Sequence, residues 1–212
     1  MNQNLTKENA FVFRITHIEN VAWILEHGLH CRNSTIRDPN FRTIGDPDLI
    51  DKRNGRIVKV PPGGTLSDYV PFYFTPFSPM LLKIKSGRGV PVIPMEEIVI
   101  FATSLPHLVK MQTNFLYTDR HAYLETANYF NDLSHLDQID WPILAERDFQ
   151  RDPNKPDKFE RYQAEALVHQ HVPVSTLLAI ICYCPKSAMR LDPLLRLAGL
   201  SFKATVNPKW FF

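Results

Sequence analysis

The chain has 212 residues and a mass of 24.5 kDa, which suits one compact domain, and we expect that domain to span residues 1–212. Its 44% hydrophobic and 22% charged residues are typical of a soluble globular protein, and no apolar run reaches the roughly 18 residues of a membrane span. A net charge of +2 is too mild for a protein that coats duplex nucleic acid, although a narrow strand-binding groove is compatible with it. The first residues lack the layout of a secretory signal, so we expect a cytoplasmic monomer without a membrane anchor.

The first predicted elements are a strand and a helix. Phe11–Ile15 is apolar apart from Arg14 and predicts a strand. Thr16 and Glu19 have the spacing of a capping box, and the apolar residues after them recur at helical spacing as far as Gly28, which is typical of a helix C-terminus. The end of this strand therefore leads directly into the start of a helix.

A long segment without a clear pattern follows, at about residues 31–66. Prolines and glycines interrupt it repeatedly, and only Pro47–Arg53 predicts a short helix. Connections of this length are uncommon in a compact domain unless they have a function or are disordered. Because several of its residues are apolar, we expect partial order and interpret the segment as a lid or a loop that covers a ligand.

The rest of the chain predicts a mixture of strands and helices. Further strands are expected at Tyr69–Phe74, Met80–Ile84, Ile98–Ala102, Ala164–His171, Leu177–Tyr183 and Phe202–Val206, and helices at Leu105–Met111, His121–Leu133 and Ser187–Leu197. The charged, proline-bearing segment Asp148–Lys158 predicts an exposed loop. Because strands and helices do not alternate regularly, the sequence predicts an α+β fold and not a doubly wound sheet.

The cysteines and histidines show no spacing that would hold a metal ion. Cys182 and Cys184 occupy alternate positions of an apolar stretch, so on a strand they would share a face, and no further ligand is spaced to join them. We expect these two and Cys31 to be buried structural cysteines, and we predict no metal site.

Two charged residues interrupt predicted strands. Glu165 begins an apolar strand after a polar loop, where burial raises the energy of a carboxylate unless something compensates the charge. It could face a positive charge that develops on a substrate, or it could be an edge-strand residue paired with a nearby lysine or arginine. Arg14 could grip phosphate or ribose at a strand end, or it could be an edge arginine that extends to solvent.

Two charged clusters are equally ambiguous. A small basic cluster in the long segment consists of Lys52, Arg53 and Arg56. These side chains could bind a ligand, or they could be solvated loop charges. Residues 119–121, Asp-Arg-His, could form an acid–cation–imidazole cluster, or they could cap a helix and make surface pairs. Spacing alone does not choose between these alternatives.

Several segments taken together point to one family. They are residues 15–20 (ITHIEN), 62–66 (PGGTL), 68–74 (DYVPFYF), 78–81 (SPML), 118–121 (TDRH), 163–165 (QAE) followed by Leu167 and Val168, and the terminal Lys209-Trp210. Their order and content resemble the DarT family, the toxins of DarTG toxin–antitoxin systems, from about residue 11 to the C-terminus. The stretch from the paired glycines to Pro-Met is the most specific part of this resemblance.

The resemblance implies a fold, a reaction and a partner. The fold is ADP-ribosyltransferase-like, of the poly(ADP-ribose) polymerase type, with a central mixed or antiparallel split sheet and flanking helices. The implied reaction transfers ADP-ribose from NAD⁺ to a base of single-stranded DNA, with thymine favoured, and releases nicotinamide without a metal. The partner is a macrodomain antitoxin, DarG, which removes the modification and binds the toxin. Guanine, RNA and protein remain alternative acceptors, and a non-catalytic single-strand-binding module is a lesser alternative.

The resemblance also implies roles for individual residues. Glu165 matches the catalytic glutamate of the family, and Arg53 matches its catalytic arginine. The residues implied to bind NAD⁺ are Arg14, Thr16, His17, Asn20, Arg53, Tyr69 and Met80. Tyr73 and His121 are implied to bind DNA, and the basic residues Lys52, Arg56 and Lys59 could follow its phosphates.

The chain departs from the family pattern at two positions. Arg14 stands where a histidine is common, and arginine serves there in other branches of the superfamily, so we expect NAD⁺ binding to survive. Phe77 stands where a basic residue is expected before Ser-Pro-Met. This second departure leaves the DNA contact, and with it the choice of base, open.

Overall fold

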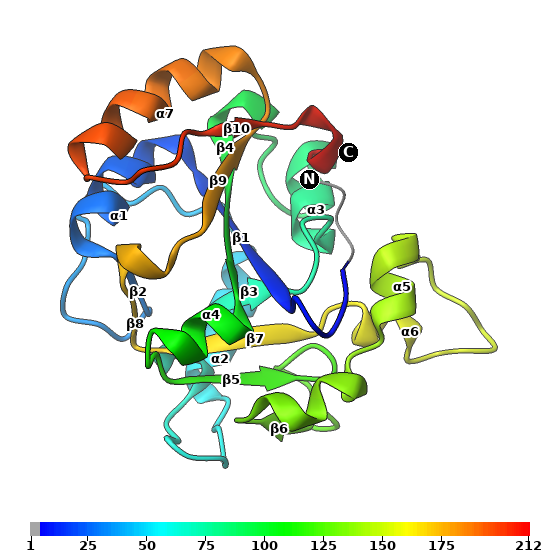
Figure 1. Cartoon of the computed structure of the whole chain (residues 1–212). Helices are drawn as coiled ribbons and strands as arrows, with labels where there is room; N and C mark the ends of the chain where they lie inside the picture. Colours follow the sequence, from blue (N-terminus) through cyan, green and yellow to red (C-terminus); the bar gives the residue numbers. More distant parts are fainter. Residues whose placement is uncertain (1–4) are drawn as a thin grey trace.

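The computed structural model describes residues 5–212 and places eight strands in one mixed sheet (Figure 1). The strand order is β10-β9-β4-β1-β3-β7-β5-β6, in which only β10 and β9 run parallel. The strands are β1 Phe11–His17, β3 Tyr69–Tyr73, β4 Ile98–Ser104, β5 Phe115–Thr118, β6 Tyr129–Phe130, β7 Glu165–His169, β9 Ala179–Cys182 and β10 Thr205–Val206. A separate pair consists of β2 Leu29–His30 and β8 His171–Val172.

The sheet is divided between β1 and β3. β1 pairs with β4 at seven positions, whereas β1 and β3 are in register only at Phe13 and Tyr73. Figure 1 shows β9, β4 and β1 running upright while β7 and β5 lie across them. Arg14 bridges the division, because its Nη1 donates to the carbonyl of Pro71 at 2.9 Å. The predicted α+β class is therefore confirmed, and the division brings the end of β3 and the start of β7 close to β1.

Seven α-helices connect and cover these strands within residues 5–212. They are α1 Val21–His27, α2 Pro47–Gly55, α3 Pro79–Ser86, α4 Leu105–Lys110, α5 Trp141–Glu146, α6 Lys158–Arg161 and α7 Pro185–Leu197. Four of these helices have an N-cap side chain that accepts a hydrogen bond from the backbone amide three residues later. The four N-cap residues are Asp46, Ser78, Ser104 and Asp140. Each of these helices also has a proline in its first turn, which favours the start of a helix. Local sequence thus decides where these helices begin.

Two clusters of buried side chains hold the layers together. The large one is centred on β4, all seven residues of which are buried, and helices α1, α4 and α7 contribute to it. The small one lies beyond β7 and joins Val58, Leu66, Tyr69, Leu116, Ala122 and Leu167. This small cluster packs the end of the long segment onto β3, β5 and β7, so the segment is an ordered part of the domain.

Three sequence predictions were wrong. Met80–Ile84 belongs to helix α3 and not to a strand, because Ser78 caps that helix and Pro79 begins it. His121–Leu133 is not a helix: Asp119 accepts from the amide and the side chain of Asn128, which folds the segment back into turns before β6. The predicted Thr16–Glu19 capping box is not formed, since the Glu19 amide donates instead to His17 Nδ1 at 3.2 Å.

The cysteine prediction was correct for two of three residues. Cys31 and Cys182 are buried, but Cys184 is partly exposed because β9 ends at Cys182 and Cys184 precedes helix α7. In residues 5–212, histidine, cysteine and carboxylate side chains form no group of three that could hold a metal ion. The helices in the same range include none with the length and apolar character needed to cross a bilayer.

Candidate active site

A buried ion pair between Arg53 and Glu165 forms the centre of the site. Arg53 lies near the end of α2, Glu165 is the first residue of β7, and Arg53 Nη1 donates to Glu165 Oε2 at 2.9 Å. The two side chains are only 11% and 3% exposed. His121, from the loop after β5, has its Nδ1 3.3 Å from Glu165 Oε1. The fold therefore brings together three residues that the family resemblance singled out, from three separate segments.

The carboxylate of Glu165 is held in its charged form. Burial alone raises its pKa, but the charge of Arg53, the proximity of His121, the Arg53 hydrogen bond and the Ala122 amide together bring the pKa below its ordinary value. The strand behind it is tied down as well, because the Glu165 amide donates to Thr118 Oγ1 at 3.3 Å. A fixed carboxylate that stays ionised in a buried position can stabilise a positive charge.

His121 is neutral near pH 7 in this environment. Burial is the main cause that lowers its pKa, and Arg53 lowers it further, while Glu165 opposes both effects. The Tyr123 amide donates to His121 Nδ1 at 3.2 Å, and the same nitrogen lies 3.3 Å from Glu165 Oε1. The neutral ring keeps one unprotonated nitrogen, so His121 can accept a proton.

Arg14 and Tyr73 lie beside the ion pair at the division of the sheet. Tyr73 is the direct cross-strand neighbour of Glu165 and of Phe13. Burial and the nearby Arg53 lower the pKa of Arg14 to about 10, and burial together with Glu165 raises the pKa of the Tyr73 hydroxyl. Arg14 stays charged and Tyr73 stays neutral at physiological pH.

Two buried guanidinium nitrogens of this group have no hydrogen-bond partner among residues 5–212. They are Arg53 Nη2 and Arg14 Nε. Buried donors are rarely left unsatisfied, because the loss of hydration without a replacement bond costs about 1–3 kcal/mol. These two donors are therefore available to the oxygen atoms of a polar ligand.

Thr16, His17 and Asn20 are buried, and Asn20 joins Thr16 to the long segment. Asn20 Nδ2 donates to Thr16 Oγ1 at 3.0 Å and to the carbonyl of Arg42 at 2.9 Å, and its Oδ1 accepts from the Arg42 amide at 2.8 Å. His17 Nε2 lies 3.2 Å from Glu97 Oε2. A cavity of about 260 Å³ opens here, lined by His17, Arg42, Thr43, Ile44, Val92, Ile93, Pro94 and Glu97.

Tyr69 and Met80 are not part of the Arg53–Glu165 cluster. Tyr69 lies at the opposite end of β3 from Tyr73, and its hydroxyl donates to the carbonyl of Gly63 at 2.7 Å. It therefore holds the glycine turn of the long segment against the sheet. Met80 lies in the first turn of α3, where it packs partly buried against the core.

The three predicted DNA-binding cations, Lys52, Arg56 and Lys59, differ in their solvent exposure and hydrogen bonding. Lys52 and Lys59 are exposed on the long segment. Arg56 is partly buried, and its Nη2 donates to the carbonyl of Leu124 at 2.8 Å, which ties the segment to the loop that contains His121. Lys52 and Lys59 are therefore accessible to phosphates, whereas Arg56 is hydrogen-bonded within the protein.

Phe77 is buried and carries a cation on its face. The guanidinium carbon of Arg147 lies 3.5 Å from the centre of the Phe77 ring. This distance is within the range of a cation–π contact. Arg147 is the residue after α5 and has a left-handed backbone with φ of 57°. The position where a basic residue was expected from the sequence is therefore covered by a basic residue from elsewhere in the chain.

Sequence reasoning missed several parts of the site. The backbone amide of Ala122 reaches the Glu165 carboxylate, and Asp119 shapes the loop around it by binding Asn128. The sequence gives no sign of the role of the Ala122 amide, because every residue except proline has a backbone N–H. The role of Asp119 could have been inferred from its place in the TDRH motif, since an Asp that follows a strand commonly binds nearby backbone amides.

Comparison with known proteins identifies the family. Residues 13–212 match the family model described as "ssDNA thymidine ADP-ribosyltransferase, DarT". The chain belongs to the DarT family. It is 50% identical over 210 residues to a DNA ADP-ribosyl transferase of Escherichia coli O127:H6, a match that covers 99% of this chain and 96% of that relative.

Solved DarT structures share the fold described above. The structure of Thermus sp. 2.9 DarT in complex with ADP-ribosylated ssDNA matches with a TM-score of 0.86 and 32% identity, covering 97% of each chain. The same DarT in complex with NAD⁺ matches with a TM-score of 0.82 and 30% identity, covering 97% of this chain and 98% of that one. The ADP-ribosyltransferase-type fold predicted from the resemblance is confirmed.

Proposed function

We propose that this DarT-family chain transfers ADP-ribose from NAD⁺ to thymine in single-stranded DNA, with Glu165 and Arg53 as its catalytic residues. The observation that carries the proposal is the buried Arg53–Glu165 pair beside two unpartnered guanidinium donors. Nicotinamide–ribose cleavage develops positive charge at the anomeric carbon of the ribose. The donors of Arg14 and Arg53 suit the hydroxyl and phosphate oxygens of such a substrate.

Glu165 faces the donor side of this reaction. Its carboxylate is ionised and fixed, so it stabilises positive charge without reorganisation as that charge develops. It also accepts from a ribose hydroxyl and so orients the sugar. Tyr73, its cross-strand neighbour, lies beside the carboxylate and is proposed to contact the DNA.

Arg53 faces the acceptor. A ring nitrogen of thymine loses its proton as the new bond forms, and negative charge spreads onto the neighbouring carbonyl oxygens. Arg53 Nη2 is free to donate to such an oxygen, whereas the very high pKa of a guanidinium makes it a poor base. Neutral His121 has one unprotonated ring nitrogen and takes up the proton that thymine releases.

Single-stranded DNA fits this arrangement better than a duplex does. The acceptor base must reach a buried site, which base stacking in a duplex prevents. The exposed Lys52 and Lys59 lie on the same segment as Arg53 and can follow the phosphates of a short strand. Arg56 contributes by holding the segment next to the loop that carries His121.

The remaining assignments rest on membership of the family. We also propose that Thr16, His17 and Asn20 bind NAD⁺. His17 lines the cavity beside β1, and Asn20 is hydrogen-bonded to Thr16 next to it. NAD⁺ binding by Tyr69 and Met80 is likewise part of this proposal and rests on the family resemblance alone. We assign the chain as the toxin of a pair with a macrodomain antitoxin of the DarG type, acting as a cytoplasmic monomer made of one domain.

Mass spectrometry tests the proposal directly. Wild-type protein is incubated with NAD⁺ and a library of single-stranded oligonucleotides, and each product is sequenced by fragmentation. We expect one added ADP-ribose on thymine, and Glu165→Gln or Arg53→Lys should lower the rate about 100–1000-fold, the loss typical of one preorganised group. Modification of a library that contains guanine but no thymine, or of RNA or protein instead, would assign a different acceptor.

A further inference from the structure

The outer face of α7 combines exposed apolar and basic side chains. It consists of Lys186, Met189, Arg190, Pro193, Arg196 and Leu197, which we call the α7 outer face. At 3.6 residues per turn these six residues fall on one side of the helix, opposite the buried Leu191 and Leu195. Met189 and Leu197 are 70% and 88% exposed. The core does not use this side of the helix.

The apolar residues of this face form a continuous stripe. Met189, Pro193 and Leu197 are four residues apart, so they follow one another along the helix. Pro193 lies inside the helix, where proline disfavours helical structure and removes one amide donor. Pro193 therefore cannot donate to the carbonyl of Met189, and its ring adds apolar surface to the stripe.

Positive charge flanks the stripe on both sides. By helical position, Arg190 lies on one side of it, Arg196 on the other, and Lys186 at its N-terminal end. Within residues 5–212, none of these three cations takes part in an ion pair, and the face contains no acidic residue. Asp192, four residues before Arg196 on the same helix, accepts from the Ala204 amide and is in no ion pair with Arg196.

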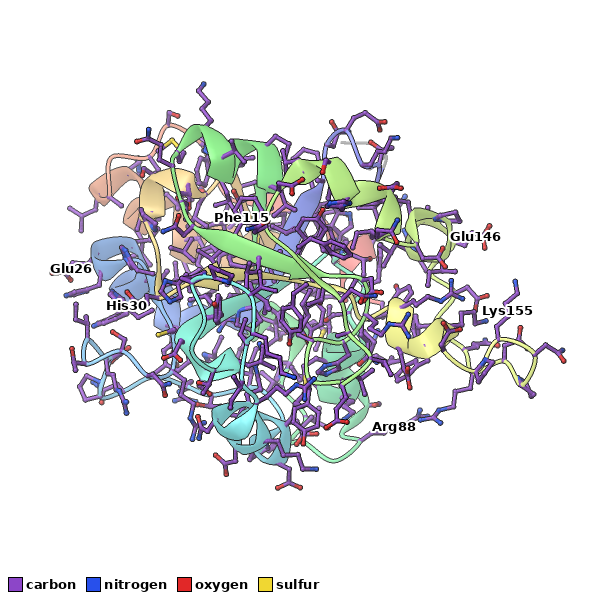
Figure 2. The ribbon with its side chains drawn as sticks, turned by 90° about the horizontal axis from the view of Figure 1, so that it is seen from below. Glu26, His30, Arg88, Phe115, Glu146 and Lys155 are labelled. Carbon is purple, nitrogen blue, oxygen red and sulfur yellow. The ribbon has the colours of Figure 1, made fainter. Side chains whose placement is uncertain are left out.

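The face lies far from the proposed active site. Figure 1 shows α7 at the outer edge of the molecule beside α1, at the opposite end from β5 and β7. Figure 2 shows Glu26 of α1 and Glu146 of α5 on opposite sides of the protein. A partner on the α7 outer face would therefore leave the Arg53–Glu165 cluster open.

We propose that the α7 outer face docks an acidic segment with apolar side chains from a partner protein. The apolar stripe favours a protein over nucleic acid, because phosphates would meet the cations but leave Met189 and Leu197 in water. Charge complementarity favours an acidic partner, and it disfavours a second copy of this chain, whose identical basic face would repel the first.

Selection of peptides from a random library tests this proposal. The library is displayed on phage and selected on wild-type protein, after removal of clones that bind the Met189→Ser/Leu197→Ser variant. We expect enriched peptides that combine Asp or Glu with large apolar residues. Binding of one such synthetic peptide, followed by fluorescence anisotropy, should weaken about tenfold or more in Met189→Ser/Leu197→Ser and in Arg190→Gln/Arg196→Gln.

Matched controls make the result decisive. Val109→Ser/Lys110→Gln removes an exposed apolar residue and a cation from α4 and should leave peptide binding unchanged. All variants should keep the circular dichroism spectrum and the NAD⁺-dependent activity of the wild type. Enrichment of peptides without acidic residues, or no enrichment that depends on this face, overturns the proposal. It is also overturned if the variants lose binding to single-stranded DNA, binding to phosphatidylglycerol vesicles or self-association instead.

Discussion

Arg53 Nη1 donates to Glu165 Oε2 at 2.9 Å, although 112 residues separate the two in the chain. Both side chains are almost completely buried, so neither charge is stable there without the other. The pair is at once part of the proposed catalytic machinery and a tie between the long segment and the sheet. Changes at either residue should therefore affect both activity and stability.

A double-mutant cycle should reveal strong coupling between these two residues. Arg53→Ala leaves a buried carboxylate without its cation, and we expect it to lower the free energy of unfolding by about 3–5 kcal/mol. Glu165→Gln should cost less, and the double variant should recover much of the loss, because no buried charge is left unpaired. Urea unfolding followed by circular dichroism measures all four proteins. Additive effects, without a coupling of at least about 0.5 kcal/mol, would contradict this account of the pair.

The site shows clearly what sequence can and cannot predict. The strands that contain Arg14 and Glu165 were found because their apolar runs are local patterns that record burial. The convergence of Arg53 and His121 on Glu165 came only from the family resemblance, since no local pattern encodes a contact across 112 residues. The short strand β5 was missed, because four apolar residues between turns are compatible with several structures.

The folded protein should lose stability as His121 is protonated. Its pKa in the folded state lies below the ordinary value of 6.5, so the unfolded state binds more protons between these two values. The free energy of unfolding must therefore fall as the pH drops through that window, and His121 has no effect on it above the window. His121→Gln should show a smaller fall between pH 7 and pH 5.5 than the wild type, as measured by urea unfolding. An identical fall in both proteins would refute a lowered pKa.

Asn20 should control the binding of NAD⁺ more than the chemical step. Asn20→Ala removes three hydrogen bonds, two of which hold the backbone of Arg42 at the cavity wall. We expect a loss of about 1–3 kcal/mol in stability and a rise in KM for NAD⁺ with a smaller change in kcat. Asn20→Asp keeps the acceptor for the Arg42 amide and should be intermediate. Equal losses in kcat from both variants would point to direct catalysis instead.

The exposed lysines of the long segment should determine the salt dependence of DNA binding. For single strands, log K falls as log salt concentration rises, and each lost phosphate contact makes this slope shallower by about 0.7. Lys52→Gln/Lys59→Gln should therefore make the slope shallower by up to about 1.4. Anisotropy titrations of a labelled oligonucleotide at several salt concentrations measure the slope. Lys186→Gln on α7 is the matched control, and a similar change there would mean that binding responds only to total charge.

The Arg147–Phe77 contact changes how the aromatic residue at position 77 should be interpreted. The sequence leads us to expect a positive charge at position 77, beside the Ser-Pro-Met motif. In space, a guanidinium lies 3.5 Å above the Phe77 ring, delivered by a residue 70 positions further along the chain. A positive charge therefore lies beside this motif even though residue 77 is apolar. The charge around the motif has to be assessed from Phe77 and Arg147 together.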